Sequence, residues 1–413
     1  MNDKNECIVT IESVAAGGEG IGRREGKAVF VRLTAPGDTV NCRIGEDHGN
    51  WARAELLEVL EPSPDRIAPR CPYYGVCGGC ELQHIGYEAQ IAAKTAILKD
   101  AFSRIGGFTP PEPEIFPSAP WEYRNRMQFH CIEQFHCIKQ FHCISSDKDS
   151  QTSAAFGLKA RKSDEIVPVH DCPTADPGIR AFLGDIPALS GEPAGPRRKP
   201  RRGARRKAGR FTVYSRGGLF LREGGVERGT TRLLDRDIRL DATVFFQSNA
   251  AALERLILSL REIARNADRS RAMADLYSGA GVFAALLGDG FPRIDLMERS
   301  EKALSLAREN IAAAHPAGTA EFFAMRDTDW AALRKTGYGF VIADPPRRGL
   351  APALAAWLAG DGPPLLAYVS CNPAALARDS AILRRGGYEL TGLALHDFYP
   401  QTAHVESVGV FSR

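Results

Sequence analysis

The chain of 413 residues is predicted to be an α/β protein whose C-terminal part forms a doubly wound, mostly parallel sheet. Three observations predict this fold class. From about Asp241 onward, short apolar runs alternate with helical stretches, and a Gly-rich turn follows the first strand-like run. Before this part, short β-branched runs separated by Gly and Pro fill residues 5 to 61 and predict a small separate β-barrel.

The bulk composition is that of a soluble globular protein with more than one core. Hydrophobic residues make up 44% of the chain and charged residues 25%, and the mean hydropathy is −0.23. No apolar run approaches the roughly eighteen residues that cross a bilayer, so we expect no membrane partner. The N-terminus, MNDKNECIVTIE, lacks the basic-then-apolar pattern of a secretory signal, so we expect a cytoplasmic protein whose ten cysteines form no disulfides.

We expect three domains. Residues 1–62 are predicted to form the barrel, which the linker EPSPDRIAP closes. Residues 63–240 carry a cysteine cluster, then an amphipathic helix over YEAQIAAKTAILKDAFSRI, stopped by Gly106 and Gly107, and then a β-rich region. Residues 241–413 carry the strands RAMADLY, RIDLME, AEFFAM, GFVIAD, LLAYVS, ELTGLALHDF and HVESVGVFS, with helices between most of them.

A basic insertion spans residues 196–210 of the central region. It holds nine Lys or Arg and no acid, so the rest of a chain with a net charge of +3 carries −6. Such a segment cannot bury a core and is predicted to be a flexible loop. It is either a solvated linker or an arm that binds the phosphates of a nucleic acid.

A cysteine cluster opens the central region at CPYYGVCGGCELQH. Cys71, Cys77 and Cys80 are too closely spaced for unrelated packing residues, and with a fourth thiolate they could hold zinc or an iron-sulfur cluster. Cys172, which precedes a proline in VPVHDCP, is the best candidate for the fourth. The spacing does not distinguish zinc from iron.

A tandem hexapeptide, QFHCIE QFHCIK QFHCIS, follows between Gln128 and Ser145. Its even spacing places the cysteines on one face of a strand and the histidines on the other. Ligands on opposite faces cannot easily meet at one ion, so the repeat indicates a lengthened hairpin rather than a metal site. The residues concerned are His130, His136 and His142 with Cys131, Cys137 and Cys143.

The Gly-rich turn DLYSGAG predicts a nucleotide-type binding site. Asp275 ends a strand, Gly279 and Gly281 allow a tight turn, and the helix that begins at VFAALLG points its N-terminus at the ligand. Glu298 ends the next strand, nineteen residues after Gly279, where an acid can bind ribose hydroxyls. The alternative is a surface acid beside a structural turn.

Three further residues predict covalent group transfer. Asp344 ends the apolar strand GFVIA before a proline-stiffened loop, where its carboxylate can accept hydrogen bonds from a substrate amide or a cofactor amine. Cys371 follows LLAYVS at the end of its strand, and a helix that begins near Ala374 should favour its thiolate. Glu406, in the last strand, either faces solvent at an edge or is a buried acid held for proton transfer.

These motifs resemble the RNA 5-methyluridine methyltransferases of the RumA/TrmA type along nearly the whole chain. The first sixty or so residues look like a TRAM domain, an OB-like RNA-binding barrel. CPYYGVCGGC with Cys172 is similar to the [4Fe-4S] signature of the family, and FFQSN, DLYSGAG, DPPRRGL, SCNPAALARD and HVESV are similar to its catalytic motifs. The resemblance implies a class I methyltransferase fold for the C-terminal domain and an iron-sulfur cluster in the central one.

The resemblance also implies roles for individual residues. Cys371 would be the nucleophile and Glu406 the general base. Four residues would contact S-adenosylmethionine or the target base: Gln247, Tyr277, Glu298 and Asp344. One departure is Val282, where many members carry Asn, so the contact that the Asn side chain would make is in doubt.

The chemistry requires these residue types. Uracil C5 is a poor nucleophile, so a thiolate that adds to C6 would create an enolate able to attack the methyl group, and a base would then remove the C5 proton. We therefore expect an enzyme that methylates C5 of a uracil in RNA, with 23S ribosomal RNA as the target and the protein as a monomer. The alternatives are a transfer RNA target, or a non-catalytic iron-sulfur protein that binds RNA.

Overall fold

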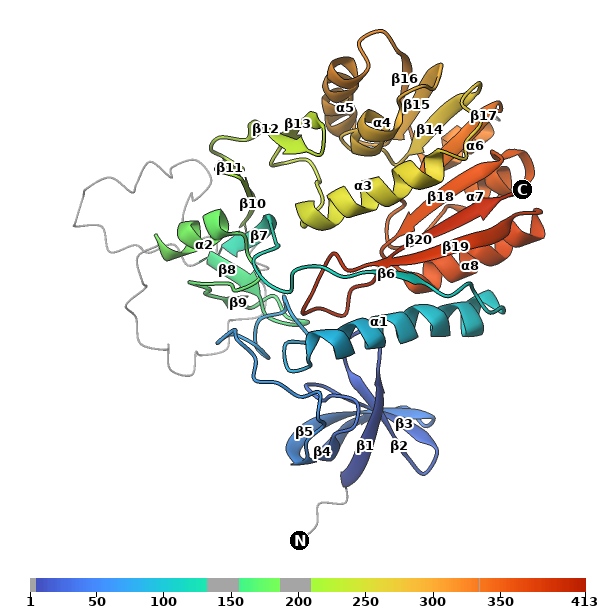
Figure 1. The fold of residues 1–413 in the computed structure, drawn as a ribbon. Coiled ribbons are helices and arrows are strands. Elements are labelled where there is room, and N and C mark those ends of the chain that lie inside the picture. Colours follow the sequence, from blue (N-terminus) through green and yellow to red (C-terminus); the bar gives the residue numbers. More distant parts are fainter. Residues whose placement is uncertain (1–4, 132–155, 186–208, 334) are drawn as a thin grey trace, which may run out of the picture.

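The computed structural model describes residues 5–131, 156–185, 209–333 and 335–413. A small barrel lies at one end of the molecule and a large sheet with its helices at the other (Figure 1). The long helix α1 (Tyr87–Ala101) runs between them, and a central β-region stands to one side. Every helix in these ranges is too short or too polar to span a bilayer.

The N-terminal strands close into a five-stranded barrel, as predicted. The strand order is β1-β2-β3-β5-β4. Alternate residues of β1 point inward, so that Cys7, Val9 and Ile11 are buried while their neighbours are more exposed. The strands are β1 (Glu6–Val14), β2 (Gly20–Arg24), β3 (Lys27–Val31), β4 (Thr39–Asp47) and β5 (Trp51–Glu61).

A buried carboxylate ties the barrel to the linker that follows it. Asp38 accepts hydrogen bonds from the backbone N–H groups of Ala35 (2.6 Å) and Ser63 (2.8 Å) and from the Nε of Arg66 (3.1 Å). Burial alone would raise the pKa of Asp38, but the hydrogen bonds from Arg66 and the two amides outweigh burial and hold the pKa below its ordinary value.

Helix α1 confirms the predicted helix and its glycine stop. It continues through one π-helical turn, η1 (Phe102–Gly106), and ends at Gly107, whose φ of 72° is left-handed. The buried face differs from the expected amphipathic pattern, because two polar side chains, Gln90 and Lys94, share it with Leu98.

The central region contains a five-stranded sheet of order β11-β10-β7-β8-β9 and a two-stranded ribbon. The QFHCI repeat beyond Cys131 and the basic insertion up to residue 208 lie outside the described residues. His130 is on β7. The elements are β7 (Arg126–Cys131), β8 (Phe156–Lys159), β9 (Ile166–Val167), α2 (Pro177–Gly184), β10 (Gly209–Arg216), β11 (Leu219–Arg222), β12 (Arg228–Leu233) and β13 (Arg236–Asp241).

The C-terminal part forms an eight-stranded sheet of order β16-β15-β14-β17-β18-β20-β19-β6. β16, β15, β14, β17 and β18 are parallel, whereas β20 runs antiparallel to both of its neighbours. This arrangement confirms the predicted doubly wound, mostly parallel sheet. The strands are β14 (Ala272–Leu276), β15 (Arg293–Glu298), β16 (Thr319–Ala324), β17 (Tyr338–Ala343), β18 (Leu365–Ser370), β19 (Glu389–His396), β20 (Glu406–Ser412) and β6 (Glu114–Phe116).

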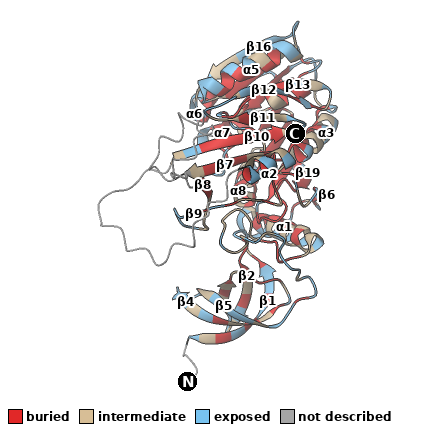
Figure 2. Cartoon of the chain, turned by 90° about the vertical axis from the view of Figure 1, so that its left-hand side faces the viewer, coloured by how far each residue is buried: buried red, intermediate tan, exposed pale blue. Residues whose placement is uncertain are grey.

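Helices cover both faces of this sheet and form two apolar cores (Figure 2). One core contains residues of α3 (Ala250–Ala264), α4 (Val282–Leu287) and α5 (Glu301–Ala314). The other contains residues of α6 (Asp327–Ala332), α7 (Pro352–Asp361) and α8 (Pro373–Arg385), together with α1. The edge strand β6 comes from far upstream and pairs in parallel with β19. The expected division at residue 240 stays a prediction.

Replacing Asp38 by Asn should destabilise the barrel, because the neutral amide cannot accept all the hydrogen bonds that the carboxylate accepts. We expect a loss of about 1–3 kcal/mol at pH 7, measured by urea unfolding. Since the folded pKa of Asp38 is depressed, its stabilising contribution is complete above about pH 4 and disappears as the pH falls through that lowered pKa. The control Asp47→Asn removes an exposed carboxylate and should change the midpoint little. Equal effects of both variants would contradict the assignment.

Candidate active site

The Gly-rich turn after β14 has the predicted strand-turn-helix geometry. Tyr277, Gly279 and Gly281 all have left-handed backbones, with φ of 64°, 53° and 74°. Gly281 caps α4, and a Cβ atom there would lie 2.9 Å from the Cβ of Ala307 on α5. A glycine at this position therefore lets α4 start close to α5 and leaves the turn open toward the carboxyl ends of the strands.

Glu298 lies beside this turn, as the sequence predicted. It ends β15, which is parallel to β14. Its carboxylate accepts hydrogen bonds from the N–H groups of Gly279 (3.1 Å) and Ser300 (2.7 Å). These contacts fix the carboxylate at the mouth of the turn, where a ribose could reach it.

Several buried polar atoms near the turn fit a ligand that carries amine and hydroxyl groups. Among the described residues, Asp275 Oδ1, Ser278 Oγ and Gln247 Oε1 have no hydrogen-bond partner. Gln247 precedes α3, and the same segment packs against the turn through Val244 and Ala280. Buried polar groups normally have partners, so these orphans fit the donors of S-adenosylmethionine. Sequence reasoning missed Ser278, although it lies within the Gly-rich motif.

Tyr277 is engaged differently from the other predicted cofactor residues. Its hydroxyl donates to Asp327 Oδ2 over 2.9 Å, at the start of α6. Burial, and then the charge of Asp327, raise the pKa of Tyr277. Its phenol therefore has a protein partner, and a contact between Tyr277 and the cofactor or target base stays a prediction.

The loop after β17 is held to the start of α8. Asn372, the N-cap of α8, donates from its Nδ2 to the carbonyl of Arg347 over 2.7 Å. The N–H of Leu350 donates to Asp379 Oδ2 over 2.9 Å. These bonds fix the position of the proline-stiffened segment that begins with Asp344.

Cys371 and Glu406 lie at the same edge of the sheet because of strand register. β18 and β20 pair with Ser370 opposite Ser407, so Cys371 follows one member of this pair and Glu406 precedes the other. Asp344 follows the neighbouring strand β17. Asp344, Cys371 and Glu406 therefore come from distant parts of the sequence but lie at the same edge of the sheet.

This arrangement makes the Cys371 thiol a weak acid in the RNA-free protein. Burial, followed by the charges of Glu406 and Asp344, raises its pKa to about 11, and Arg347 opposes this increase. Helix α8 begins near Cys371 as predicted, whereas burial and the two carboxylates disfavour the thiolate, so the expected effect of the helix on the thiolate stays a prediction.

Glu406 is a buried acid, which excludes the alternative that it faces solvent, while its part in proton transfer stays a prediction. It is 4% exposed. Burial, and then the charge of Asp344, raise its pKa well above the ordinary value, while Arg347 lowers it. Burial raises the pKa of Asp344 to about 7. Arg347 was missed by sequence reasoning, although its place directly after the two prolines could have identified it.

The four predicted cluster cysteines face one small cavity. Cys71, Cys77, Cys80 and Cys172 line it, together with Arg124 and eight further residues. Burial raises the pKa of Cys80 to about 12. No group of three or more His, Cys, Asp or Glu among the described residues is arranged to hold a metal ion. The four thiols share one cavity, and the iron-sulfur cluster expected there stays a prediction.

Two half-buried residues, Arg124 and Tyr399, are linked electrostatically to this cavity and to Cys371 and Glu406. Arg124 lines the cavity, and its charge lowers the pKa of Tyr399. Burial, and next the charge of Glu406, raise the pKa of Tyr399 to about 12, and Cys371 contributes in the same direction. Neither Arg124 nor Tyr399 belongs to a motif that the sequence singled out, so only the fold reveals them.

Comparison with known proteins identifies relatives for the whole chain. Two family models match, a TRAM domain at residues 6–57 and tRNA (Uracil-5-)-methyltransferase at residues 230–413. An uncharacterized RNA methyltransferase of Treponema denticola is 30% identical over 94% of this chain and 95% of its own length. The 23S rRNA (uracil(1939)-C(5))-methyltransferase RlmD of Azoarcus sp. is 31% identical over 98% of this chain and 99% of its own length.

A solved structure has the same fold. The tRNA (uracil-54, C5)-methyltransferase of Pyrococcus abyssi, in complex with S-adenosyl-L-homocysteine, superposes with a TM-score of 0.68. It is 22% identical, and the match covers 98% of this chain and all of that chain.

Removing the charge of Asp344 should make Cys371 more reactive. Asp344, with a pKa of about 7, is ionised at pH 9, so Asp344→Asn should lower the pKa of Cys371 and raise the fraction of thiolate. We expect faster alkylation by iodoacetamide at pH 9, followed by mass spectrometry of the peptide that contains Cys371. Asp329→Asn, which removes an exposed carboxylate on α6, is the control. An unchanged or slower rate in Asp344→Asn would contradict the electrostatic account.

Proposed function

Because this chain belongs to the family of RNA uracil-C5 methyltransferases, we propose that it transfers a methyl group from S-adenosylmethionine to C5 of a uridine in 23S ribosomal RNA. The observation that carries this proposal is the meeting of Cys371, Glu406 and Asp344 beside the Gly-rich turn. A non-catalytic RNA-binding protein would have no need for a thiol close enough to two carboxylates for their charges to raise its pKa.

Cys371 is the proposed nucleophile. Its thiolate adds to C6 of the uracil, and the electron pair of the C5–C6 bond moves to C5 and the O4 carbonyl. S-adenosylmethionine supplies the methyl group that C5 accepts. The uracil must be unstacked from the RNA to reach a partly buried sulfur.

Glu406 and Asp344 have complementary proposed roles. Glu406 accepts the C5 proton, the C5–C6 double bond forms again, and the bond between C6 and the sulfur of Cys371 breaks. Asp344 positions the amine of the cofactor or the amide of the uracil ring. Burial, and then the charge of Asp344, raise the pKa of Glu406, which favours the carboxyl group holding the proton that it accepts.

The proposed cofactor site consists of Gln247, Tyr277, Glu298 and Asp344. Glu298 would bind the ribose hydroxyls from the mouth of the Gly-rich turn, and the unpaired Oε1 of Gln247 would accept from an amine of the cofactor. The left-handed glycines let the backbone of the turn approach the ligand.

The target RNA is proposed from the relatives. Those of Azoarcus sp. and Bordetella bronchiseptica, which match along nearly the whole chain, are named as 23S rRNA methyltransferases. Transfer RNA is the second candidate, because the family description and the Pyrococcus structure name it. We also propose that the TRAM barrel (1–62) and the basic insertion (196–210) hold the RNA, while the central domain (63–240) and the catalytic domain (241–413) carry the two sites.

We propose that Cys71, Cys77, Cys80 and Cys172 hold a [4Fe-4S] cluster. The support is that all four line one cavity and that a cluster is normally bound by four thiolates. Four protein ligands leave no open iron position, so the proposed role is to cross-link the segment around Cys80 to the turn that carries Cys172.

The target proposal is tested with unmodified RNA. Purified protein should incorporate the methyl group of labelled S-adenosylmethionine into 23S rRNA transcripts, and mapping should find 5-methyluridine at one site. Cys371→Ala should reduce incorporation by at least about a thousandfold, because the covalent route is lost, while RNA binding should stay nearly intact. Methylation of transfer RNA alone would favour the second candidate, and substantial turnover by Cys371→Ala would reject the covalent mechanism.

The cluster proposal is tested by spectroscopy and metal analysis. Protein purified without oxygen should be brown and contain iron and sulfide in equal amounts. Cys172→Ser should lose most of both, because a cluster ligand is removed. Cys42→Ala, which alters a buried cysteine of the barrel, is the matched control and should retain them. Zinc in place of iron, or an unaffected Cys172→Ser, would contradict the proposal.

A further inference from the structure

The loop between β19 and β20, residues 397–405, leads directly to Glu406. His396 and Glu406 form the last pair of the β19–β20 ladder, so the loop enters and leaves at this pair. The loop is also mostly buried: Asp397, Phe398, Gln401 and Thr402 are each at most 2% exposed, whereas Tyr399 is half-buried and His404 is exposed. A buried irregular loop must satisfy its polar groups within the protein.

Four consecutive carbonyls of this loop each accept a hydrogen bond from another element. Asn249, which caps α3, donates to Phe398 O, and the Tyr123 hydroxyl donates to Pro400 O. The remaining two carbonyls accept from α1 and from the cysteine segment, which we define as residues 71–85. The acceptors and their distances are Phe398 O at 3.1 Å, Tyr399 O at 2.9 Å, Pro400 O at 2.8 Å and Gln401 O at 2.9 and 3.1 Å.

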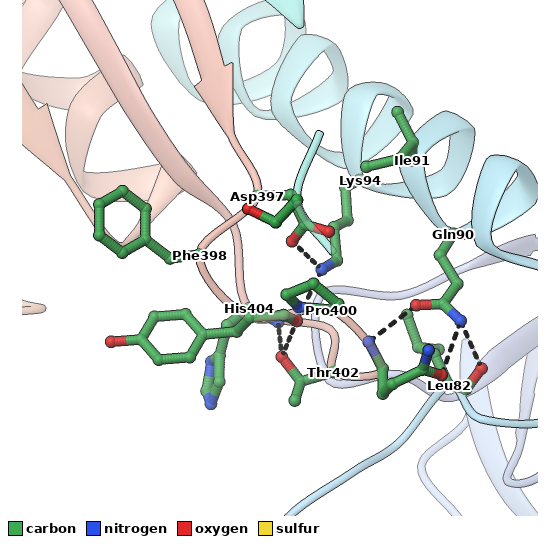
Figure 3. A network of polar contacts seen from close by, with 12 residues as sticks. Leu82, Gln90, Ile91, Lys94, Asp397, Phe398, Pro400, Thr402 and His404 are labelled. Carbon is green, nitrogen blue, oxygen red and sulfur yellow. Dashed lines mark hydrogen bonds and ion pairs between the residues drawn. The ribbon is translucent and has the colours of Figure 1, made fainter. Parts of the chain in front are cut away.

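A fully buried ion pair joins α1 to the first residue of the loop. Lys94 Nζ lies 2.6 Å from Asp397 Oδ1, and neither side chain is exposed. The same ammonium donates to Tyr399 O. Figure 3 shows Lys94 reaching from α1 to Asp397. The second carboxylate oxygen of Asp397 accepts from the hydroxyl of Tyr87, which lies about two turns before Lys94 on α1.

Gln90 of α1 makes a reciprocal contact with the middle of the loop. Its Oε1 accepts from the N–H of Gln401 (2.9 Å), and its Nε2 donates to Gln401 Oε1 (3.0 Å). The same Nε2 donates to the carbonyls of Leu82 and Ile85 in the cysteine segment. Figure 3 shows the Gln90 side chain pointing toward Leu82. Gln401 has a φ of 69°, a strained conformation for a residue other than glycine. Surrounding contacts must hold it there.

The cysteine segment is also hydrogen-bonded to the loop at Gln401. The N–H groups of Glu81 and Leu82 both donate to Gln401 O. Glu81 Oε2 accepts from the N–H of Ala403 over 3.2 Å. These two residues directly follow Cys80, so the loop that leads to Glu406 is bonded to the segment that carries three of the cavity cysteines.

We propose that Gln90 and Lys94 are positioning residues for Glu406. Helix α1 holds the 397–405 loop in its strained conformation through these two side chains, and the cysteine segment holds the same loop through Glu81 and Leu82. The inference rests on the proposed function, because it assigns the loop a part in removal of the C5 proton. Strand pairing fixes Glu406 from one side, through Ser407 and Ser370. The buried loop fixes it from the other side. A displacement of about 1 Å is enough to lower the rate of a step around a hundredfold.

The test separates methyl transfer from proton removal. Transfer is measured with labelled S-adenosylmethionine, and proton removal by tritium release from RNA that contains [5-³H]uridine. The variants are Gln90→Leu and the pair Lys94→Met with Asp397→Asn, which avoids leaving one buried charge unpaired. Gln401→Asn is a milder third variant, because Asn tolerates a left-handed backbone while its shorter side chain cannot reach Gln90.

We expect each variant to transfer the first methyl group at a rate within about twofold of the unaltered protein and to release tritium at least about tenfold more slowly. An SDS-resistant protein-RNA adduct should then accumulate. Lys99→Met, on the exposed side of α1, is the matched control and should leave both rates unchanged. Glu406→Gln is the reference that should accumulate the adduct most strongly.

The outcomes distinguish this inference from the function on which it rests. Failure of Glu406→Gln to accumulate an adduct would refute the proposed base and leave the positioning role without a purpose. If Glu406→Gln accumulates the adduct but Gln90→Leu, Gln401→Asn and the paired variant do not, strand pairing alone places Glu406 and the inference is wrong. A parallel fall of methyl transfer and tritium release without adduct would indicate only a structural role, and would also overturn it.

Discussion

The antiparallel insertion of β20 between β18 and β19 is the constraint on which the site depends. Parallel strands alone bring together residues that follow strands, such as Asp344 and Cys371. β20 runs the other way, so its first residue, Glu406, arrives at the same edge. The proposed nucleophile and the proposed base thus lie at one edge of the sheet although 35 positions separate them in the chain. Burial raises the pKa of both Cys371 and Glu406, because a low dielectric disfavours charge. The charge of Glu406 raises the pKa of Cys371 further, because a carboxylate disfavours a nearby thiolate.

Much of this architecture could be predicted from local patterns. The barrel strands, the seven C-terminal strand candidates and the glycine stop of α1 follow from periodicity and turn residues, which act over a few positions. Asp344 and Cys371 could be found because each ends an apolar run. Lys94 could not be found in this way, since a lysine on a helix is normally exposed and only Asp397, about three hundred positions later, explains its burial. The raised pKa of Cys371 could not be predicted for the same reason, because the carboxylates that raise it come from other strands.

The two sites of the molecule are joined by buried polar contacts rather than by a continuous apolar core. Arg124 stands at the wall of the cysteine cavity, and its charge acts on Tyr399 and His404 in the loop before Glu406. Glu81 and Leu82 bond the same loop directly. Arg124 Nε has no hydrogen-bond partner among the described residues, so the rigidity of this connection rests on the bonds from Glu81 and Leu82, which are satisfied at both ends. The central region can therefore define the geometry of a site to which it contributes no reacting atom.

The edge strand β6 limits where the chain can be divided into separate fragments, because it pairs with β19. Residues 114–116 pair with β19 and cover one side of a sheet otherwise built from residues 272–412. A fragment beginning at residue 230 would leave β19 with unsatisfied amides and carbonyls along its outer rim, and exposed rims of this kind recruit other chains into aggregates. The methyl-transferring half of the molecule is therefore not a module that could be cut free, even though its sequence reads as one.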